Sequence, residues 1–391
     1  MRSWRAVALA TITVIAATAT AGAGAASSPP TSEPPVTDEA STVTAGPAGA
    51  TLPATETVAT DAVWEKVVPG GDCACADGTE FNFWVREADP ARVVLFLEGG
   101  GACFDPTSCA FTEEESTTYD WNISPDDEPS SKGGIVAFDN PDNPFADYSF
   151  VYVPYCTGDI HLGEVTREYS PELTVEHVGM VNGMAALSYL AENFADAEQV
   201  VVVGESAGSI ASPVYAGLVS DLLPDAQVTV YADGSGAYPD DPDLNAGLGG
   251  LWGTFETMPD WEVNEGLTPQ DWGIPRFWVQ AGLHDPEIVM SRFDHAYDEV
   301  QAAFMTITGA DTSDLAASIA ANEAAIEAAG VTQHSFTAPG TDHTLVLGDG
   351  FYDLEVDGVA LMDWVADIVA GADVADVTCT DCDAPSPATT G

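Results

Sequence analysis

One short motif constrains this chain more than any other: Gly-Glu-Ser-Ala-Gly at residues 204–208, directly after four consecutive valines. A continuous β-branched run of this kind predicts a buried strand, and the residues after the motif can start a helix. Between a strand and a helix, G-x-S-x-G predicts a strained turn packed too closely for side chains on either flank of the serine. Such a turn lifts the hydroxyl of Ser206 above the sheet edge as a nucleophile. The alternative is an ordinary strand-to-helix turn.

Short apolar runs alternate with helical segments along much of the chain. Residues 173–194 have apolar side chains at helical spacing, and residues 315–329 form an Ala-rich helical stretch. Alternation of this kind predicts an α/β protein with a mainly parallel sheet covered by helices on both faces, which with the serine turn is the α/β-hydrolase fold. The predicted strands are residues 92–97, 148–155, 199–203, 228–232, 277–281 and 334–338.

Two segments, residues 238–272 and 285–329, have no strand pattern. Insertions of this kind commonly lie over the carboxyl edge of a parallel sheet, where they form a cap over a substrate cleft. We therefore expect them to shape the binding site.

A glycine-rich loop follows the first long apolar run. Residues without bulk let backbone N–H groups approach the oxyanion that develops during acyl transfer. We predict an oxyanion hole formed by the N–H groups of Gly100, Gly101 and Ala207. The alternative for the loop is flexibility without function.

The base that activates Ser206 is predicted to be His343, which follows the last predicted strand. The order Ser, Asp, His along the chain is the order of α/β-hydrolases. His161 follows a strand end, and with Asp159 it is a candidate to line the substrate cleft. Four other histidines are expected to have local roles, with two of them in helices; they are His177, His284, His295 and His334.

The acid of the triad should follow a late strand and orient the imidazole. Asp285 comes after the apolar run at residues 277–281, and we predict it as the acid. Asp233, at the end of the strand before it, is the rival. Asp342 is disfavoured because an immediate neighbour cannot easily reach the imidazole of His343.

Seven cysteines suggest disulfides, the default in an exported protein. Cys103 and Cys109 are expected to form a local bridge, and Cys156 is expected to be left unpaired. The pairs Cys73/Cys75 and Cys379/Cys382 either tie the two ends of the folded region together or, less in keeping with export, hold zinc.

The first 26 residues have the pattern of a secretory signal peptide, with a basic start, an apolar stretch at residues 6–17 and small residues before the cleavage site. Residues 27–60 are Pro, Thr, Ser and Ala-rich, which predicts a disordered linker. We expect a folded domain at residues 61–373 and a flexible, Cys-containing tail at residues 374–391. The protein is predicted to be secreted and extracellular, without stable membrane association because no later stretch is apolar enough to span a bilayer.

The charge balance is extreme, with 63 Asp and Glu against 9 Lys and Arg and a formal net charge of -54. A surface of this kind repels nucleic acid and anionic lipid. Because the acids are spread along the chain, we interpret them as adaptation of the whole surface to high salt. The alternative is an acidic secreted protein with no special habitat.

Several blocks occur together: Leu-Glu-Gly-Gly-Gly-Ala-Cys at residues 97–103, Pro-Tyr-Cys-Thr-Gly-Asp at 154–159, the Gly-Glu-Ser-Ala-Gly turn and a Gly-x-x-His ending at His343. In this combination, with Asp285 after a late predicted strand, the chain resembles the pectin acetylesterase family, which includes the animal Wnt deacylase Notum. The resemblance spans residues 73–345. Gly101 stands where animal members carry a bulky aromatic side chain.

The resemblance implies a serine carboxylesterase that uses Ser206, His343 and Asp285 without metal or cofactor, acting on acetyl groups of a polysaccharide such as pectin. A polyanionic pectin backbone fits poorly with this negative surface. One alternative is a lipid or long-acyl ester hydrolase, with an apolar acyl pocket at residues 238–272 that includes Trp252 and Trp261. Another is a non-catalytic binding protein on the same fold. We expect a monomer.

Overall fold

The computed structural model describes residues 63–112, 118–124 and 127–382. The signal peptide and linker predicted for residues 1–60 lie outside these described residues, as does the last part of the predicted tail. Within the described part, no helix combines the length and apolar character needed to cross a bilayer.

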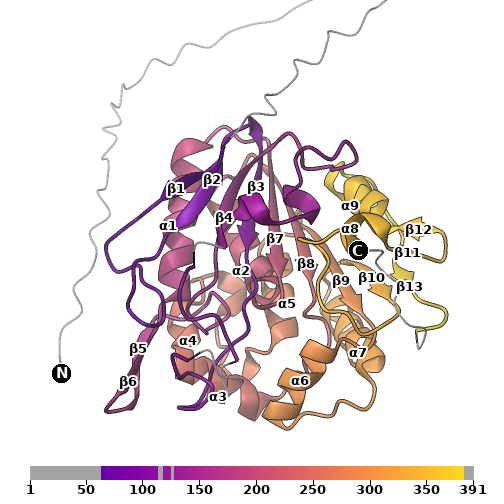
Figure 1. Cartoon of the computed structure of the whole chain (residues 1–391). Helices are drawn as coiled ribbons and strands as arrows, with labels where there is room; N and C mark the ends of the chain where they lie inside the picture. Colours follow the sequence, from indigo (N-terminus) through magenta and orange to yellow (C-terminus); the bar gives the residue numbers. More distant parts are fainter. Residues whose placement is uncertain (1–62, 113–117, 125–126, 383–391) are drawn as a thin grey trace, which may run out of the picture. The chain divides into compact units, whose positions relative to one another are not determined.

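A twisted sheet with the strand order β1-β2-β4-β3-β7-β8-β9-β10-β13 forms the centre of the domain (Figure 1). From β4 to β13 all neighbours pair in parallel, whereas β1 and β2 run antiparallel at one edge. This arrangement confirms the predicted parallel α/β sheet. The strands are β1 Glu65–Val67, β2 Phe83–Arg86, β3 Asp89–Leu97, β4 Tyr148–Val153, β7 Gln199–Glu205, β8 Gln227–Asp233, β9 Val289–His295, β10 His334–Ala338 and β13 Val377–Thr378.

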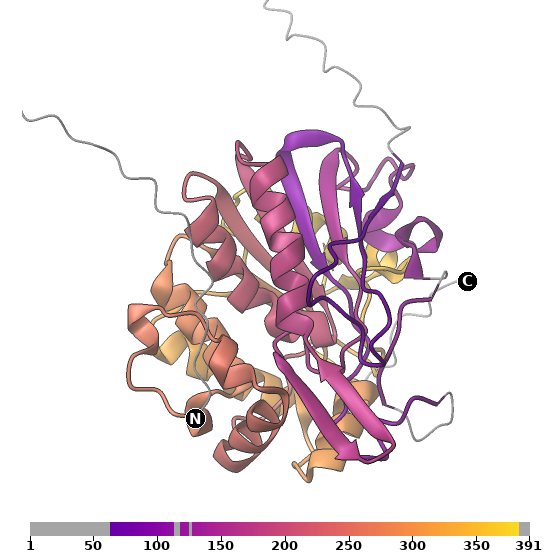
Figure 2. The ribbon, with the colours of Figure 1, turned by 90° about the vertical axis from the view of Figure 1, so that its left-hand side faces the viewer.

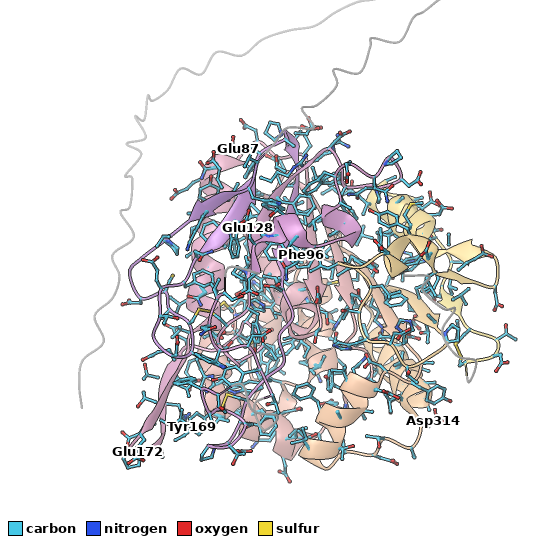
Figure 3. All side chains as sticks on the ribbon, viewed as in Figure 1. Glu87, Phe96, Glu128, Tyr169, Glu172 and Asp314 are labelled. Atoms are coloured by element: carbon cyan, nitrogen blue, oxygen red, sulfur yellow. A yellow bond between two sulfur atoms is a disulfide. The ribbon has the colours of Figure 1, made fainter. Side chains whose placement is uncertain are left out.

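Helices cover both faces of the sheet because successive strand residues point to opposite sides. In β3, Val93, Leu95 and Leu97 belong to the core under α1 (Gly179–Asn193), α2 (Ala207–Leu222) and α5 (Ile274–His284), which Figure 2 shows on one face. The alternate residues Val94 and Phe96 face the second core. Figure 3 shows the labelled Phe96 inside the molecule. That second core packs under α8 (Gly350–Asp353) and α9 (Leu361–Val369).

The remaining elements gather mainly at the carboxyl end of the sheet, in the lower part of Figure 1. They come largely from the segments that were expected as insertions, together with a β-hairpin that follows β4. The hairpin is β5 Val165–Ser170 and β6 Leu173–His177, and the others are α3 Pro242–Trp252, α4 Thr254–Thr257, η4 Glu262–Asn264, η5 Pro269–Asp271, α6 Glu299–Thr308 and α7 Leu315–Ala328. Smaller elements elsewhere are η2 Pro129–Ser131, η3 Gly134–Val136, β11 Glu355–Val356 and β12 Val359–Ala360.

One strand prediction was wrong. The apolar run at residues 277–281 lies in helix α5, and the next strand is β9, eight residues further on. A short, fully apolar run is compatible with either a buried helix or a buried strand, so its composition does not decide between them. The segment 285–329, which lacked a strand pattern, therefore begins with a central strand.

Three other boundaries differ from the predictions. The helix expected over residues 173–194 begins as strand β6, and helix α1 starts at Gly179. His177 and His295, expected in helices, end strands β6 and β9 and are buried. Strand β13, within the predicted flexible tail, pairs with β10, so the folded domain continues beyond residue 373.

The disulfides confirm one pairing and correct the others. Cys103 pairs with Cys109 as expected. Cys75 pairs with Cys156, so Cys156 is not the leftover thiol; among the described residues the free cysteine is Cys73. Cys379 pairs with its near neighbour Cys382 rather than with the other end of the domain. The predicted disulfide between the two ends of the folded region is therefore wrong. Among the described residues, three of the four cysteines considered for zinc are in disulfides, so the four do not form a zinc site.

Candidate active site

The turn between β7 and α2 has the strained geometry predicted for it. Ser206 has φ 50 and ψ -114, a left-handed backbone conformation that non-glycine residues rarely adopt. A side chain at Gly208 would collide with the carbonyl oxygen of Leu97 in β3. The N–H of Ser206 donates to the carbonyl of Asp233 at 2.8 Å, which ties the turn to the end of β8. Close packing on both sides thus holds the serine in its strained conformation.

His343 lies beside Ser206 at the carboxyl edge of the sheet. Its Nε2 is 2.8 Å from the Ser206 Oγ, and its Nδ1 is 2.6 Å from Oδ2 of Asp298. The loop that carries His343 runs beside the segment that carries Asp298. It is held there because the N–H groups of Tyr297 and Glu299 donate to the carbonyls of Gly340 and Thr341, each at 3.0 Å. A serine, an imidazole and a carboxylate therefore form one hydrogen-bonded chain.

The predicted acid Asp285 is wrong, because Asp298 occupies its position against the imidazole. Asp285 caps the end of α5, where its carboxylate accepts the N–H of Glu287 at 3.0 Å. It precedes β9 and so lies toward the amino edge of the sheet, whereas Asp298 follows the carboxyl end of the same strand. The misassigned strand at residues 277–281 moved the expected acid to the wrong edge.

Asp298 is fully buried, and its hydrogen bonds hold the carboxylate in one orientation. Its Oδ1 accepts the N–H groups of Val300 and Gln301 at 2.8 and 2.9 Å, so it caps the N-terminus of α6. The Gln301 side chain donates to Oδ2 at 3.0 Å, beside the contact with His343. The sequence did carry a weak signal, since Asp298 with Gln301 three residues later resembles a helix-capping pair.

The rival Asp233 also lies near the site but does not touch the imidazole. Its buried Oδ2 accepts the N–H groups of Leu345 and Val346, both at 2.8 Å. Asp233 therefore holds the loop that follows His343. Asp342 is exposed, in keeping with its being disfavoured as the acid.

The glycine loop lies directly against the serine. A Cβ built on Gly99 would be 2.9 Å from the Cβ of Ser206. Gly101 has φ 75, and any side chain there would collide with the carbonyl of Thr118. Within the described residues, the N–H groups of Gly100 and Gly101 have no acceptor, and Ala207 is at the first position of α2, where a helix leaves N–H groups unpaired. These donors flank the serine, as an oxyanion hole requires.

Asp159 and His161 do not line the cleft, so this prediction was wrong. Both are almost completely buried. Asp159 accepts the hydroxyl of Thr157 at 2.6 Å and the N–H of Gly179 at 2.7 Å, while His161 Nε2 lies 2.8 Å from the carbonyl oxygen of Glu98. Burial lowers the pKa of His161 to about 4, so the imidazole is neutral. His161 thus holds the residue that precedes the glycine loop, and Asp159 joins the segment after β4 to the start of α1.

A cleft of about 650 Å³ opens above Ser206 and His343. One wall is charged and is formed by Glu98, Asp120, Asp127, Lys132 and Glu205. The opposite wall is apolar and comes from one side of helix α6. It consists of Val300, Ala303, Phe304 and Ile307, of which Val300 is 38% and Ile307 51% exposed.

The side chains of the charged wall were not predicted to be functional from the sequence. Lys132 forms an ion pair with Glu98, and the hydroxyl of Tyr152 donates to the same carboxylate at 2.7 Å. Burial raises the pKa of Glu205 to about 7, and the nearby charge of Glu98 adds to the rise. Burial likewise raises the pKa of Glu98, opposed by the charge of Lys132. Glu98 and Glu205 lie inside the glycine-loop and serine motifs, where roles were predicted only for their neighbours, and the other residues of the wall lie in no motif.

A smaller apolar pocket adjoins the cleft. Its volume is about 120 Å³, and Phe304 lines both cavities. The predicted insertion at residues 238–272 supplies much of its lining, including Trp252. Trp261 does not line it; that side chain stacks on His284 at a centroid distance of 4.3 Å.

One group in the described part of the chain brings several metal-binding residue types together: Cys103, Cys109 and His177. Its two sulfur atoms are joined in a disulfide. They are therefore not thiolates, the form in which cysteine binds a metal.

Comparison with known proteins places the chain in one family. The family model described as pectinacetylesterase matches residues 57–250. "Pectin acetylesterase 5" of Arabidopsis thaliana is 29% identical over 179 residues, 44% of this chain and 40% of that protein. "Palmitoleoyl-protein carboxylesterase NOTUM" of Schmidtea mediterranea is 30% identical over 146 residues, 35% of this chain and 26% of that protein. The matches thus span two fifths or less of these curated relatives.

The crystal structure of the Wnt deacylase Notum from Drosophila superposes with a TM-score of 0.59. The superposition covers 82% of this chain and 98% of that one, at 17% sequence identity. At this level of identity the likeness establishes the fold. It confirms that the sheet and its helices form an α/β-hydrolase.

Proposed function

Because this chain belongs to the pectin acetylesterase and Notum family of α/β-hydrolases, we propose that it is a secreted serine carboxylesterase that removes acetyl groups from a polysaccharide or a similar polyol. The observation that carries the proposal is the hydrogen-bonded chain from Ser206 through His343 to Asp298, at 2.8 and 2.6 Å. A nucleophile within reach of a base, with the base oriented by a third group, is the arrangement that acyl transfer needs.

The reaction proceeds through an acyl-enzyme. His343 Nε2 accepts the proton of Ser206 as Oγ attacks the ester carbonyl, and the N–H groups of Gly100, Gly101 and Ala207 stabilise the oxyanion. His343 then gives the proton to the departing alcohol. Water, deprotonated by the same imidazole, attacks the acyl-enzyme and releases the carboxylic acid. Asp298 stays ionised and stabilises the imidazolium.

A fluorophosphonate probe tests the mechanism directly. The wild-type protein should be labelled covalently and should release acetate from p-nitrophenyl acetate, and Ser206→Ala should abolish both. Ser188→Ala, an exposed serine on helix α1, is the matched control and should leave both unchanged. Folded wild-type protein that is neither labelled nor active would instead favour the non-catalytic binding protein.

A second candidate function, hydrolysis of long-acyl or lipid esters, is favoured by the apolar pocket beside the cleft. Its volume of about 120 Å³ is below that of an engineered apolar cavity, about 150 Å³, that admits benzene. The apolar lining of the pocket thus favours a long acyl chain, whereas its small volume favours a short one. Rates on p-nitrophenyl esters of rising chain length separate the two candidates, because a preference for long chains contradicts the acetylesterase.

The natural substrate is tested by acetate release from acetylated pectin, xylan and other acetylated glycans. The proposed enzyme should release acetate from at least one of these polymers, and Ser206→Ala should release none.

A further inference from the structure

The two halves of an ester meet different surfaces at this site. With the carbonyl oxygen at the glycine loop, the apolar pocket beyond Phe304 offers the acyl group an apolar surface. The alcohol half then remains in the open cleft, against the charged wall of Glu98, Asp120, Asp127, Lys132 and Glu205. The composition of that wall therefore decides which alcohols bind.

Among its described residues, the charged wall contains one cationic side chain, and that side chain is already in an ion pair. Among the described residues, Lys132 is the only Lys or Arg that lines the cleft, and its ammonium group is in an ion pair with Glu98. The side chains of Lys132 and Glu98 are 23% and 10% exposed, so the pair is largely shielded from water. Three carboxyl groups of the wall form no ion pair of their own among the described residues, and Lys132 acts on them only from its pair with Glu98: Asp120, Asp127 and Glu205.

Asp120 lies directly over the glycine loop. Its N–H donates to the carbonyl of Gly100 at 2.9 Å, and its Oδ2 would be 2.8 Å from a Cβ built on Gly100. The carboxylate is therefore held beside the predicted oxyanion donors, in the same cleft as Ser206 and His343.

Glu205 lines the same cleft and directly precedes Ser206. Its Oε2 is buried and has no hydrogen-bond partner among the described residues. A buried carboxylate oxygen without a donor is costly, and a ligand that supplies an O–H or N–H group relieves this cost. The unpaired oxygen thus points to a hydrogen-bond donor on the substrate.

We propose that Asp120 and Glu205 bind the alcohol half of the substrate and select sugars that present hydroxyl or ammonium donors and carry no carboxylate. This specificity rests on the proposed esterase function. A uronate unit would bring its own negative charge against unpaired carboxylates, with no free cation in the described cleft to balance it. The preferred substrate is therefore an acetylated neutral or amino sugar rather than a uronate polymer.

A matched pair of substrates tests this. Methyl 3-O-acetylgalactopyranoside and its 6-carboxylate analogue differ only at C6, where a carboxylate replaces the hydroxymethyl group. At pH 8 and 0.1 M salt, kcat/KM should favour the neutral sugar by roughly tenfold, and the ratio should fall below about threefold in Asp120→Asn/Glu205→Gln. Glu172→Gln, exposed at the tip of the β5–β6 hairpin (Figure 3), neutralises one carboxylate far from the cleft and should keep the wild-type ratio.

Salt provides a test that needs no variant. Raising the salt from 0.1 to 1 M shortens the screening length from about 10 to about 3 Å, so the wild-type ratio should shrink toward one. Hydrolysis of p-nitrophenyl acetate, which has no sugar, reports the esterase function separately. If that ester is cleaved but both sugars react equally, or if the double variant keeps the wild-type ratio, the specificity is overturned while the esterase stands. If the wild type does not cleave it, both proposals fail.

Discussion

At the scale of single residues, Asp298 does two tasks with one carboxylate. Oδ1 accepts the first free N–H groups of helix α6, and Oδ2 faces the imidazole of His343 at 2.6 Å. The two N–H donors hold the carboxylate in one orientation against the imidazole. We therefore expect its charge, as well as its shape, to matter for activity.

The first prediction separates Asp298 from Asp285. Asp298→Asn should lower kcat on p-nitrophenyl acetate by roughly 10⁴-fold, as the same change does in the Ser-His-Asp template, because an amide favours the wrong imidazole tautomer. Asp285→Asn is the matched control and should stay within about twofold of wild type. The assignment fails if Asp285→Asn loses the activity and Asp298→Asn keeps it.

A site residue can be predicted from the sequence when a short motif around it marks its role. Ser206 lies in a five-residue motif behind a valine strand, and the glycine loop directly follows an apolar run, so both were found from the sequence. His343 follows a clear strand. The acid has no motif of its own and depends on the strand before it, which is why an error in that strand displaced the assignment to Asp285.

At the scale of elements, strand β9 was hidden by its own polar residues. Arg292 and Asp294 are buried in it, and Arg292 pairs with Glu323 of helix α7 at 3.0 Å. A charged residue in a central strand contradicts the apolar pattern by which buried strands are recognised, and only tertiary pairing makes its burial tolerable. The strands without such residues, including β7 and β10, were found close to their true bounds.

The second prediction concerns the packing of β3 against α2. Gly208→Ala would place a methyl group against the carbonyl of Leu97, and overpacking of this kind costs roughly 1–3 kcal/mol or more. We expect a lower Tm and reduced activity, because the turn that presents Ser206 must shift.

The control for this change is Gly247→Ala in the exposed part of helix α3, where no atom lies within 4 Å of the added methyl group. This change should stabilise the protein by up to about 1 kcal/mol. Thermal melting of both variants checks the pair, and equal Tm values for the two would contradict the close packing inferred at Gly208.

At the scale of the whole molecule, the domain combines a strongly negative chain with buried acids. The formal net charge is -54 at pH 7. Burial raises the pKa of Glu205 to about 7 and those of Asp159 and Asp294 to about 6. Both features make the folded state bind protons more tightly than the unfolded chain does.

The third prediction follows from the sign of these shifts. Because the pKa values are raised on folding, their stabilising contribution is full below about pH 4 and is lost as pH rises through about 6 to 7. Burial acts in the opposite direction on His161 and His177, whose pKa values it lowers to about 4, so the test isolates one acid. At constant ionic strength, the difference in Tm between wild type and Asp294→Asn should favour the wild type more at pH 5 than at pH 8. A difference in Tm that is the same at both pH values would contradict the raised pKa of Asp294.

The fourth prediction is that salt stabilises the fold. Repulsion among so many acids is screened as ionic strength rises, so Tm should increase between 0.1 and 2 M NaCl. A neutral osmolyte at equal water activity controls for effects of salt that do not depend on charge. A Tm indifferent to salt would remove the hypothesis of high-salt adaptation.

The double task of Asp298 couples the shape of the cleft to its reactivity. Helix α6 supplies the apolar cleft wall and is capped by the same carboxylate that orients His343. If α6 swings outward to admit a bulky glycan, it pulls on the anchor of the imidazole. In the proposed esterase, an outward movement of α6 therefore shifts the carboxylate that orients the base, so we expect full rates only from substrates that bind while the helix keeps its position.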